Sequence, residues 1–130
     1  HDYAVIDTPA RPNSDDLQEL AKGCDLLILP TTPDVVSLEP MLAIANDIGD
    51  ARYMALLAIV PSYPSKEGAT MQKELIENGI PTFKTMIRRS SAFQKAALAG
   101  KPVNQMPGRD KIPWNDFKSL GQEIMEVLSK

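Results

Sequence analysis

Tyr53-Met54-Ala55-Leu56-Leu57-Ala58-Ile59-Val60 is an unbroken apolar run of the kind that forms a central strand of a sheet. The turn residues Pro61-Ser62-Tyr63-Pro64-Ser65 follow it. Behind this turn, a segment with helical spacing extends from about Lys66 to Asn78, and Gly79 is expected to end it. A strand, a turn and a helix in this order indicate a βαβ unit and therefore a parallel sheet.

The same alternation continues in both directions along the chain. Further strands are expected at 3–7, 26–29 and 81–87, and further helices at about 14–23, 35–48, 91–100 and 113–128. The pattern predicts an α/β fold with three layers, in which a mostly parallel sheet carries helices on both faces. The 130 residues are expected to form a single domain.

Several residues predict where the helices begin and end. Asn13 or Ser14 is expected to cap the first helix, and Asp34 the second. Pro113 suits the first turn of the last helix. That helix carries one apolar stripe that we expect to pack on the sheet, formed by Trp114, Phe117, Leu120, Ile124, Val127 and Leu128.

Composition places the chain among ordinary globular proteins, with 43% hydrophobic and 24% charged residues. The single Cys24 cannot form an internal disulfide, which favours a reducing compartment. The sequence shows neither a signal-peptide pattern nor an apolar run of the roughly 20 residues that a membrane span needs. We therefore expect a cytoplasmic protein without a membrane partner.

The net charge of −3 conceals a strong asymmetry along the chain. Residues 1–50 carry ten acids and two bases, whereas residues 84–111 carry seven bases against Asp110 alone. A basic block in an acidic protein is a candidate surface for a polyanion. From the sequence alone, a plain solvated face explains the block equally well.

Asp7-Thr8-Pro9 ends the first expected strand at a sharp turn. In nucleotide-hydrolysing α/β proteins, an acidic residue at such a place organises magnesium beside the phosphates, and the loop G-x-x-x-x-G-K-[ST] cradles those phosphates. The only Gly-Lys pair is Gly100-Lys101, which Pro102 follows, so the sequence contains no such loop. Half of a nucleotide site is present. Taken without further context, Asp7 is better explained as a turn or capping residue.

Four segments occur together in an order that is found in one family: Tyr3-Ala4-Val5-Ile6-Asp7-Thr8-Pro9, Leu29-Pro30-Thr31-Thr32-Pro33, Thr82-Phe83-Lys84-Thr85-Met86-Ile87-Arg88-Arg89, and Ala96 through Gly100-Lys101-Pro102-Val103. With them the chain resembles the C-terminal two-thirds of ParA-type partition ATPases, relatives of the septum-positioning ATPases. The resemblance covers nearly the whole chain. It implies a P-loop NTPase-like fold that is incomplete without the N-terminal phosphate-loop strand.

The resemblance also implies roles for individual residues. Asp7 matches the Walker B aspartate, which would hold magnesium through water, and Thr8 and Pro9 begin the switch segment that responds to the γ-phosphate. Residues beside the adenine base of ATP or ADP would be Pro61, Ser62, Ile87 and Arg88. The family usually has proline at the position of Arg88, where this chain departs from the pattern.

In the family, an ATP-dependent homodimer binds DNA non-specifically through basic residues late in the chain. The matching positions here are Lys84, Arg89, Lys95 and Lys101. Such binding consists mainly of phosphate contacts and needs no residues that read bases. The resemblance implies a bacterial, nucleoid-associated protein of plasmid or chromosome segregation, with a ParB-like centromere-binding partner that stimulates hydrolysis.

A second hypothesis is a truncated, non-catalytic homologue that serves as a DNA- or partner-binding module. In either case we expect this chain alone neither to bind ATP or magnesium tightly nor to hydrolyse ATP. A nitrogenase-type iron protein is disfavoured, because its cluster needs two cysteines per subunit. A septum-positioning protein is disfavoured, because its last helix should be basic and here it is not. An unrelated flavodoxin-like domain would leave the ordered motifs unexplained.

Overall fold

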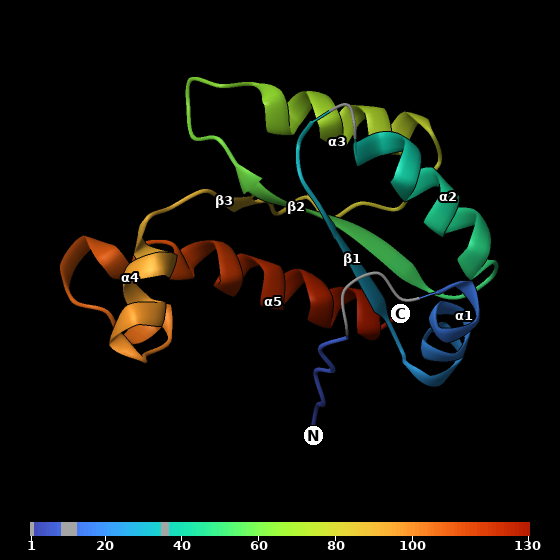
Figure 1. Cartoon of the computed structure of the whole chain (residues 1–130), viewed down its shortest axis with the longest axis horizontal. Coiled ribbons are helices and arrows are strands. Elements are labelled where there is room, and N and C mark those ends of the chain that lie inside the picture. The colour runs from blue at the N-terminus through green and yellow to red at the C-terminus, as the bar shows by residue number, and fades with distance from the viewer. Residues whose placement is uncertain (1, 9–12, 35–36) are drawn as a thin grey trace.

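A three-stranded parallel sheet forms the centre of the molecule in the computed structural model, which describes residues 2–8, 13–34 and 37–130 (Figure 1). Its strands are β1 (Leu27–Thr31), β2 (Tyr53–Val60) and β3 (Ile87–Arg88), in the order β1-β2-β3. The register of β1 against β2 runs from Leu27 opposite Tyr53 to Thr31 opposite Leu57. The expected central strand and the parallel sheet are therefore confirmed.

Five α-helices and two short 3-10 helices surround the described part of the sheet. The α-helices are α1 (Ser14–Gly23), α2 (Leu38–Ile48), α3 (Glu67–Glu77), α4 (Ala92–Ala99) and α5 (Trp114–Leu128). The 3-10 helices are η2 (Val103–Gln105) and η3 (Gly108–Lys111). In Figure 1, α2 and α3 lie above the sheet and α5 lies below it.

Successive side chains of β2 point to opposite faces of the sheet, as the geometry of a strand requires. Ala55 and Leu57 are completely buried in a core with α1, α2 and α3, where Leu75 is equally inaccessible. Leu56 faces the other way, into a core that contains Leu120 of α5. An apolar run without polar alternation thus serves two cores at once, which confirms helices on both faces of the sheet.

The predicted strand at 3–7 is wrong. Residues 2–8 have no regular secondary structure, and the side chains of Tyr3, Val5 and Ile6 are 60%, 99% and 70% exposed. A β-type sequence becomes a strand only when a neighbouring chain pairs with its N–H and C=O groups. Nothing in the described residues pairs with this segment, so its apolar side chains are not covered.

The predicted strand at 81–87 is much shorter than expected. A single bridge joins Thr82 to Ala55, and regular pairing resumes only at β3. Between them, the main-chain N–H groups of Lys84 and Thr85 donate to the Glu123 carboxylate of α5, at 2.7 and 2.9 Å. Because side-chain oxygens satisfy these donors, the segment does not need the ladder of β2.

The helix ends follow the sequence closely. The Asn13 side chain accepts the N–H of Asp16 at 2.8 Å and caps α1. Gly79 and Gly100 follow α3 and α4 with φ of 78° and 66°, a left-handed conformation that glycine adopts without strain. Pro113 precedes α5 as predicted.

A small helical corner is attached to one end of the sheet. Its own core consists of Ala92 and Ala96 of α4 together with Val103 and Met106. Figure 1 shows α4 and the following short helices beside the start of α5, away from α1 and α2. The apolar stripe of α5 packs on the sheet at Leu120, Ile124 and Val127, whereas Trp114 and Phe117 at its beginning are each 38% exposed. The prediction for this stripe therefore holds only for its later turns.

Candidate functional site

The carboxyl ends of β2 and β3 border a shallow pocket of about 260 Å³. Parallel sheets of α/β proteins place their ligands at this edge, because every strand there ends in a loop that can carry polar groups. Pro61 and Arg88, two of the four residues expected beside a nucleotide base, line the pocket together with Gly68 and Met86. The fold thus brings two positions together that are far apart in the sequence.

Gly68 lets α3 approach this edge closely. A Cβ atom at this position would lie 2.5 Å from Cγ1 of Val60 and 2.9 Å from Sδ of Met86, closer than atoms can come without displacement. The absence of a side chain in the first turn of α3 therefore sets the distance between the helix and the end of β2.

Arg88 is held by Asp116 of α5. Its Nη2 and Nε atoms donate to the two carboxylate oxygens of Asp116 at 2.8 and 3.2 Å, and its main-chain N–H donates to the same carboxylate at 3.0 Å. Asp116 is 9% exposed, whereas the Arg88 side chain is 55% exposed. The hydrogen bonds to Asp116, followed by its negative charge, raise the pKa of Arg88. The planar guanidinium is therefore fixed in orientation while one side remains open to solvent.

Glu123 lies two turns after Asp116 on α5 and binds the same segment. Asp116 and Glu123 together accept the main-chain N–H groups of Lys84, Thr85 and Arg88. The side chain of Gln72 on α3 donates to the carbonyl oxygens of Phe83 and Lys84, at 2.9 and 3.2 Å. Segment 83–88 is thus fixed by side chains from both layers of helices.

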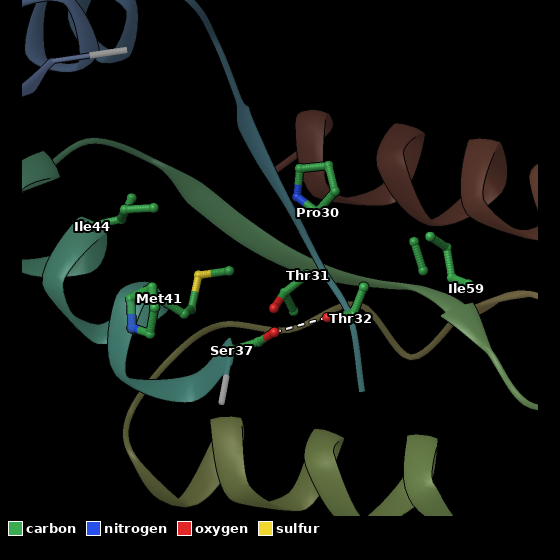
Figure 2. Close-up of a pocket in the computed structure, with 9 residues that line it drawn as sticks. Pro30, Thr31, Thr32, Ser37, Met41, Ile44 and Ile59 are labelled. Atoms are coloured by element: carbon green, nitrogen blue, oxygen red, sulfur yellow. Dashed lines mark hydrogen bonds between the residues drawn. The ribbon is translucent and has the colours of Figure 1, made fainter. Parts of the chain in front are cut away.

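A second depression, of about 480 Å³, lies between α2 and the ends of β1 and β2 (Figure 2). Its wall includes Thr31, Thr32, Ser37 and Ile59, the last of which has a positive φ of 57° at the irregularity between Ala58 and Val60. Bulges of this kind bend a strand and are frequent beside functional sites.

A hydroxyl and carboxylate network closes one side of this second depression. The Thr32 and Ser37 hydroxyl oxygens are 2.8 Å apart, and both side chains bond to the carboxylate of Asp34. The hydrogen bond from Thr32, followed by that from Ser37, lowers the pKa of Asp34. Asp34 also accepts the N–H of Ser37 at 3.0 Å. The N-cap residue of α2 is Ser37, without a side-chain cap hydrogen bond, so the predicted capping of this helix by Asp34 is wrong.

The structure does not bring Asp7 to either pocket. In Figure 1 the described part of the N-terminal segment lies below α5, whereas the arrowhead of β2 lies above it. Thr8 belongs to the same exposed segment, and Pro9 lies outside the described residues. Ser62 is exposed in the loop after β2, and Ile87 is buried toward α5.

The described residues do not fit a magnesium site by themselves. No group of three or more His, Cys, Asp or Glu side chains gathers in the ranges 2–8, 13–34 and 37–130. Asp7 is a lone, exposed carboxylate, and magnesium binding through one carboxylate requires phosphate oxygens beside it. The edge with Pro61 and Arg88, by contrast, fits one side of a planar base, because an arginine plane can stack on an aromatic ring.

All four positions expected to bind DNA are exposed. Lys95 and Lys101 belong to the helical corner. Arg89 directly follows β3 and donates its N–H to Val60 of β2, and Lys84 lies in the loop that Glu123 holds. Lys95 forms a salt bridge of 3.4 Å with Asp110. Within the described part of the chain, no salt bridge engages Lys84, Arg89 or Lys101.

Sequence reasoning missed Asp116 and Glu123 as structural ligands of the strand edge. One signal was present for Asp116, because it precedes Leu120, Ile124 and Val127 at helical spacing and therefore lies on the buried stripe of α5. A carboxylate at such a position needs partners. Which donors it meets depends on the packing of α5 against β3, and that is not visible in the sequence.

Comparison with known proteins gives one informative similarity. No protein-family model matches the chain. The chain is 27% identical over 128 residues to a protein of Gloeobacter kilaueensis described as "Maintenance of carboxysome distribution protein A". The aligned region covers 95% of this chain but 59% of the relative, so the chain spans less than two-thirds of the curated relative that it matches. The similarity is therefore not confined to one motif.

In the part of the chain that the structure describes, every helix is too short or too polar to cross a lipid bilayer.

Proposed function

We propose that this chain is part of a ParA-like ATPase that distributes a cargo within a bacterial cell. The observation that carries the proposal is the similarity to a carboxysome distribution protein over 95% of the chain. The ordered motifs of the partition ATPases and the parallel α/β architecture with helices on both faces agree with it. The cargo is a plasmid, a chromosome or, as the name of the relative indicates, a protein compartment.

In the proposed protein, this chain supplies the base-side wall of the nucleotide site. Pro61 and Arg88 would border the adenine of ATP or ADP, and the Asp116 carboxylate would keep the Arg88 guanidinium in one orientation. A phosphate loop, which the 130 residues do not contain, would supply the phosphate contacts.

The second part of the proposal is non-specific DNA binding by the ATP-bound homodimer. Lys84, Arg89, Lys95 and Lys101 are exposed and lie in the region of highest positive charge. Contact with phosphates requires positive charge and an accessible position, and these side chains have both. A ParB-like partner on the cargo would stimulate hydrolysis and release the dimer.

The intact mass of the protein purified from its natural source tests the first part. We expect a mass above 14.3 kDa and a G-x-x-x-x-G-K-[ST] loop ahead of Asp7. A natural product of 14.3 kDa would instead favour the non-catalytic binding module. We expect the 130-residue chain alone to show no magnesium-dependent ATP turnover. Measurable turnover would contradict the division of roles between this chain and a separate phosphate loop.

Duplex DNA binding by the intact, ATP-loaded protein tests the second part. Arg89→Glu and Lys101→Glu are expected to weaken binding of any duplex sequence to a similar degree, and to reduce the dependence on salt. Lys22→Glu, on exposed α1, is the matched control, because it changes charge by the same amount at a distant surface. Equal losses in all three variants would mean that only net charge matters and that the helical corner is not the interface.

A further inference from the structure

The beginning of α5 carries an aromatic stack that is open to solvent. Phe93 of α4 meets Phe117 edge to face, with ring centroids 5.9 Å apart and planes at 81°. Trp114 stacks on Phe117, with centroids 6.4 Å apart and planes at 20°. Trp114 and Phe117 are each 38% exposed, and Ile112 beside them is 50% exposed. The buried member of the core on this helix is Leu120, so Trp114 and Phe117 lie at the edge of that core.

Positive charges lie next to this stack along the chain. Arg109 and Lys111 belong to η3, directly before α5, and Lys118 follows Trp114 by four residues, which places both on one side of the helix. All three are exposed, and none takes part in a salt bridge within the described ranges. The two nearby acids are occupied elsewhere, Asp110 with Lys95 and Asp116 with Arg88.

We propose that this surface, defined by Trp114, Phe117, Arg109, Lys111 and Lys118, binds single-stranded nucleic acid by stacking an unpaired base on Trp114. The proposal extends the DNA binding proposed above, on which it rests. Phosphate contact alone uses no aromatic side chain, whereas proteins that bind single strands combine cations with rings on which bases stack. A base on the indole continues a stack that already contains Phe117. Bases in a duplex are stacked on each other and cannot reach the ring.

The chain offers a direct measurement, because Trp114 is its only tryptophan. The fluorescence of Trp114 is recorded while the 130-residue chain is titrated with oligothymidylate of about 15 nucleotides, a length in the range of known single-strand sites. We expect strong quenching that saturates, and little change with a duplex of equal length or with heparin. Quenching of equal size by heparin, or single-strand binding without any change in fluorescence, would overturn the proposal.

Two variants separate stacking from charge. Trp114→Leu is expected to weaken single-strand binding by about 30-fold, the middle of the range for loss of one base–aromatic stack, while duplex binding stays the same. Lys118→Gln is expected to lower the slope of log K against log salt by about 0.7, one phosphate contact, with the stack intact. Lys22→Gln is the control and should change neither quantity. Because Trp114→Leu removes the fluorophore, binding by the variants is measured through the fluorescence anisotropy of labelled oligothymidylate. Circular dichroism verifies folding, and Trp114→Met replaces the leucine variant if that one unfolds.

The result for duplex DNA keeps this proposal distinct from the proposed function. Suppose that duplex binding depends on Arg89 and Lys101, but that oligothymidylate quenches Trp114 fluorescence no more than the duplex does. This result would refute the stacking surface and leave the proposed duplex binding intact. If the protein binds neither single-stranded nor duplex DNA, the proposed nucleic-acid interface as a whole is refuted. Saturable quenching by an acidic peptide such as oligoglutamate, with none by oligothymidylate, would overturn the proposal in favour of a protein partner.

Discussion

Replacement of Asp116 tests how α5 holds the edge of the sheet. Its carboxylate accepts three hydrogen bonds from Arg88, one of them from the main-chain N–H. Asp116→Asn keeps the size of the side chain and one acceptor oxygen for that N–H, but removes the charge. Because the Arg88 side chain is 55% exposed, solvent screens the ion pair, and we expect a loss of about 1 kcal/mol in the free energy of unfolding.

Asp116→Ala also leaves the main-chain N–H of Arg88 without its partner. An unpaired, partly buried donor costs about 1–3 kcal/mol, so the total loss is expected to be about 2–4 kcal/mol. With a urea slope of about 2 kcal/mol/M, the unfolding midpoint falls by roughly 1–2 M for alanine and by roughly 0.5 M for asparagine. Arg88→Gln is the control, because it removes the guanidinium and keeps the main-chain bond, and it should resemble Asp116→Asn.

Urea unfolding followed by circular dichroism measures all three variants and the double variant Arg88→Gln, Asp116→Asn. The coupling energy from this cycle should be about 0.5–1 kcal/mol, the energy of a screened pair. If Asp116→Ala lowers the free energy of unfolding no more than Asp116→Asn does, then the hydrogen bond from the main-chain N–H of Arg88 contributes nothing to stability. That result would refute the claim that Asp116 fixes segment 83–88 through the main chain of Arg88.

Three further predictions concern packing and pH. Gly68→Ala should lower the free energy of unfolding by about 1–2 kcal/mol, because its Cβ would overlap Val60 and Met86 by more than helix propensity offsets. Gly121→Ala should raise the free energy of unfolding by about 0.5–1 kcal/mol, because nothing lies within 4 Å of the new Cβ. Urea unfolding measures this matched pair, and changes of the same sign in both variants would contradict the packing argument. The pKa of Asp34 is lower in the folded than in the unfolded state. Its ionised form therefore stabilises the fold at any pH above the unfolded-state pKa of about 3.9. This stabilisation is lost as the pH falls through the pKa of Asp34 in the folded state. Carboxyl NMR should show Asp34 titrating below the range of free aspartate, and Thr32→Val should raise its pKa; an unchanged pKa would exclude the hydroxyl network as the cause.

The candidate site was only partly accessible to sequence reasoning. Pro61 and Arg88 could be named in advance through the family resemblance, and the fold places them in one pocket. The fixation of Arg88 by Asp116 could not be named, because a carboxylate 28 residues away along the chain becomes a partner only after α5 has packed. The exposure of Trp114 escaped prediction for a similar reason. A stripe at helical spacing does not show where the sheet beneath it ends.

The alternation of strands and helices, and most of their ends, could be predicted from the sequence. These features depend on local physics: an apolar run such as Tyr53–Val60 must be buried, Asn13 can cap a helix, and Gly79 and Gly100 can adopt a positive φ. Which of the expected strands form depends on the packed chain. Residues 3–7 have strand-forming side chains but no described neighbour to pair with, and Lys84 and Thr85 give their N–H groups to Glu123 instead of β2. Strand formation requires hydrogen-bond partners from distant parts of the chain, and only the folded chain supplies them.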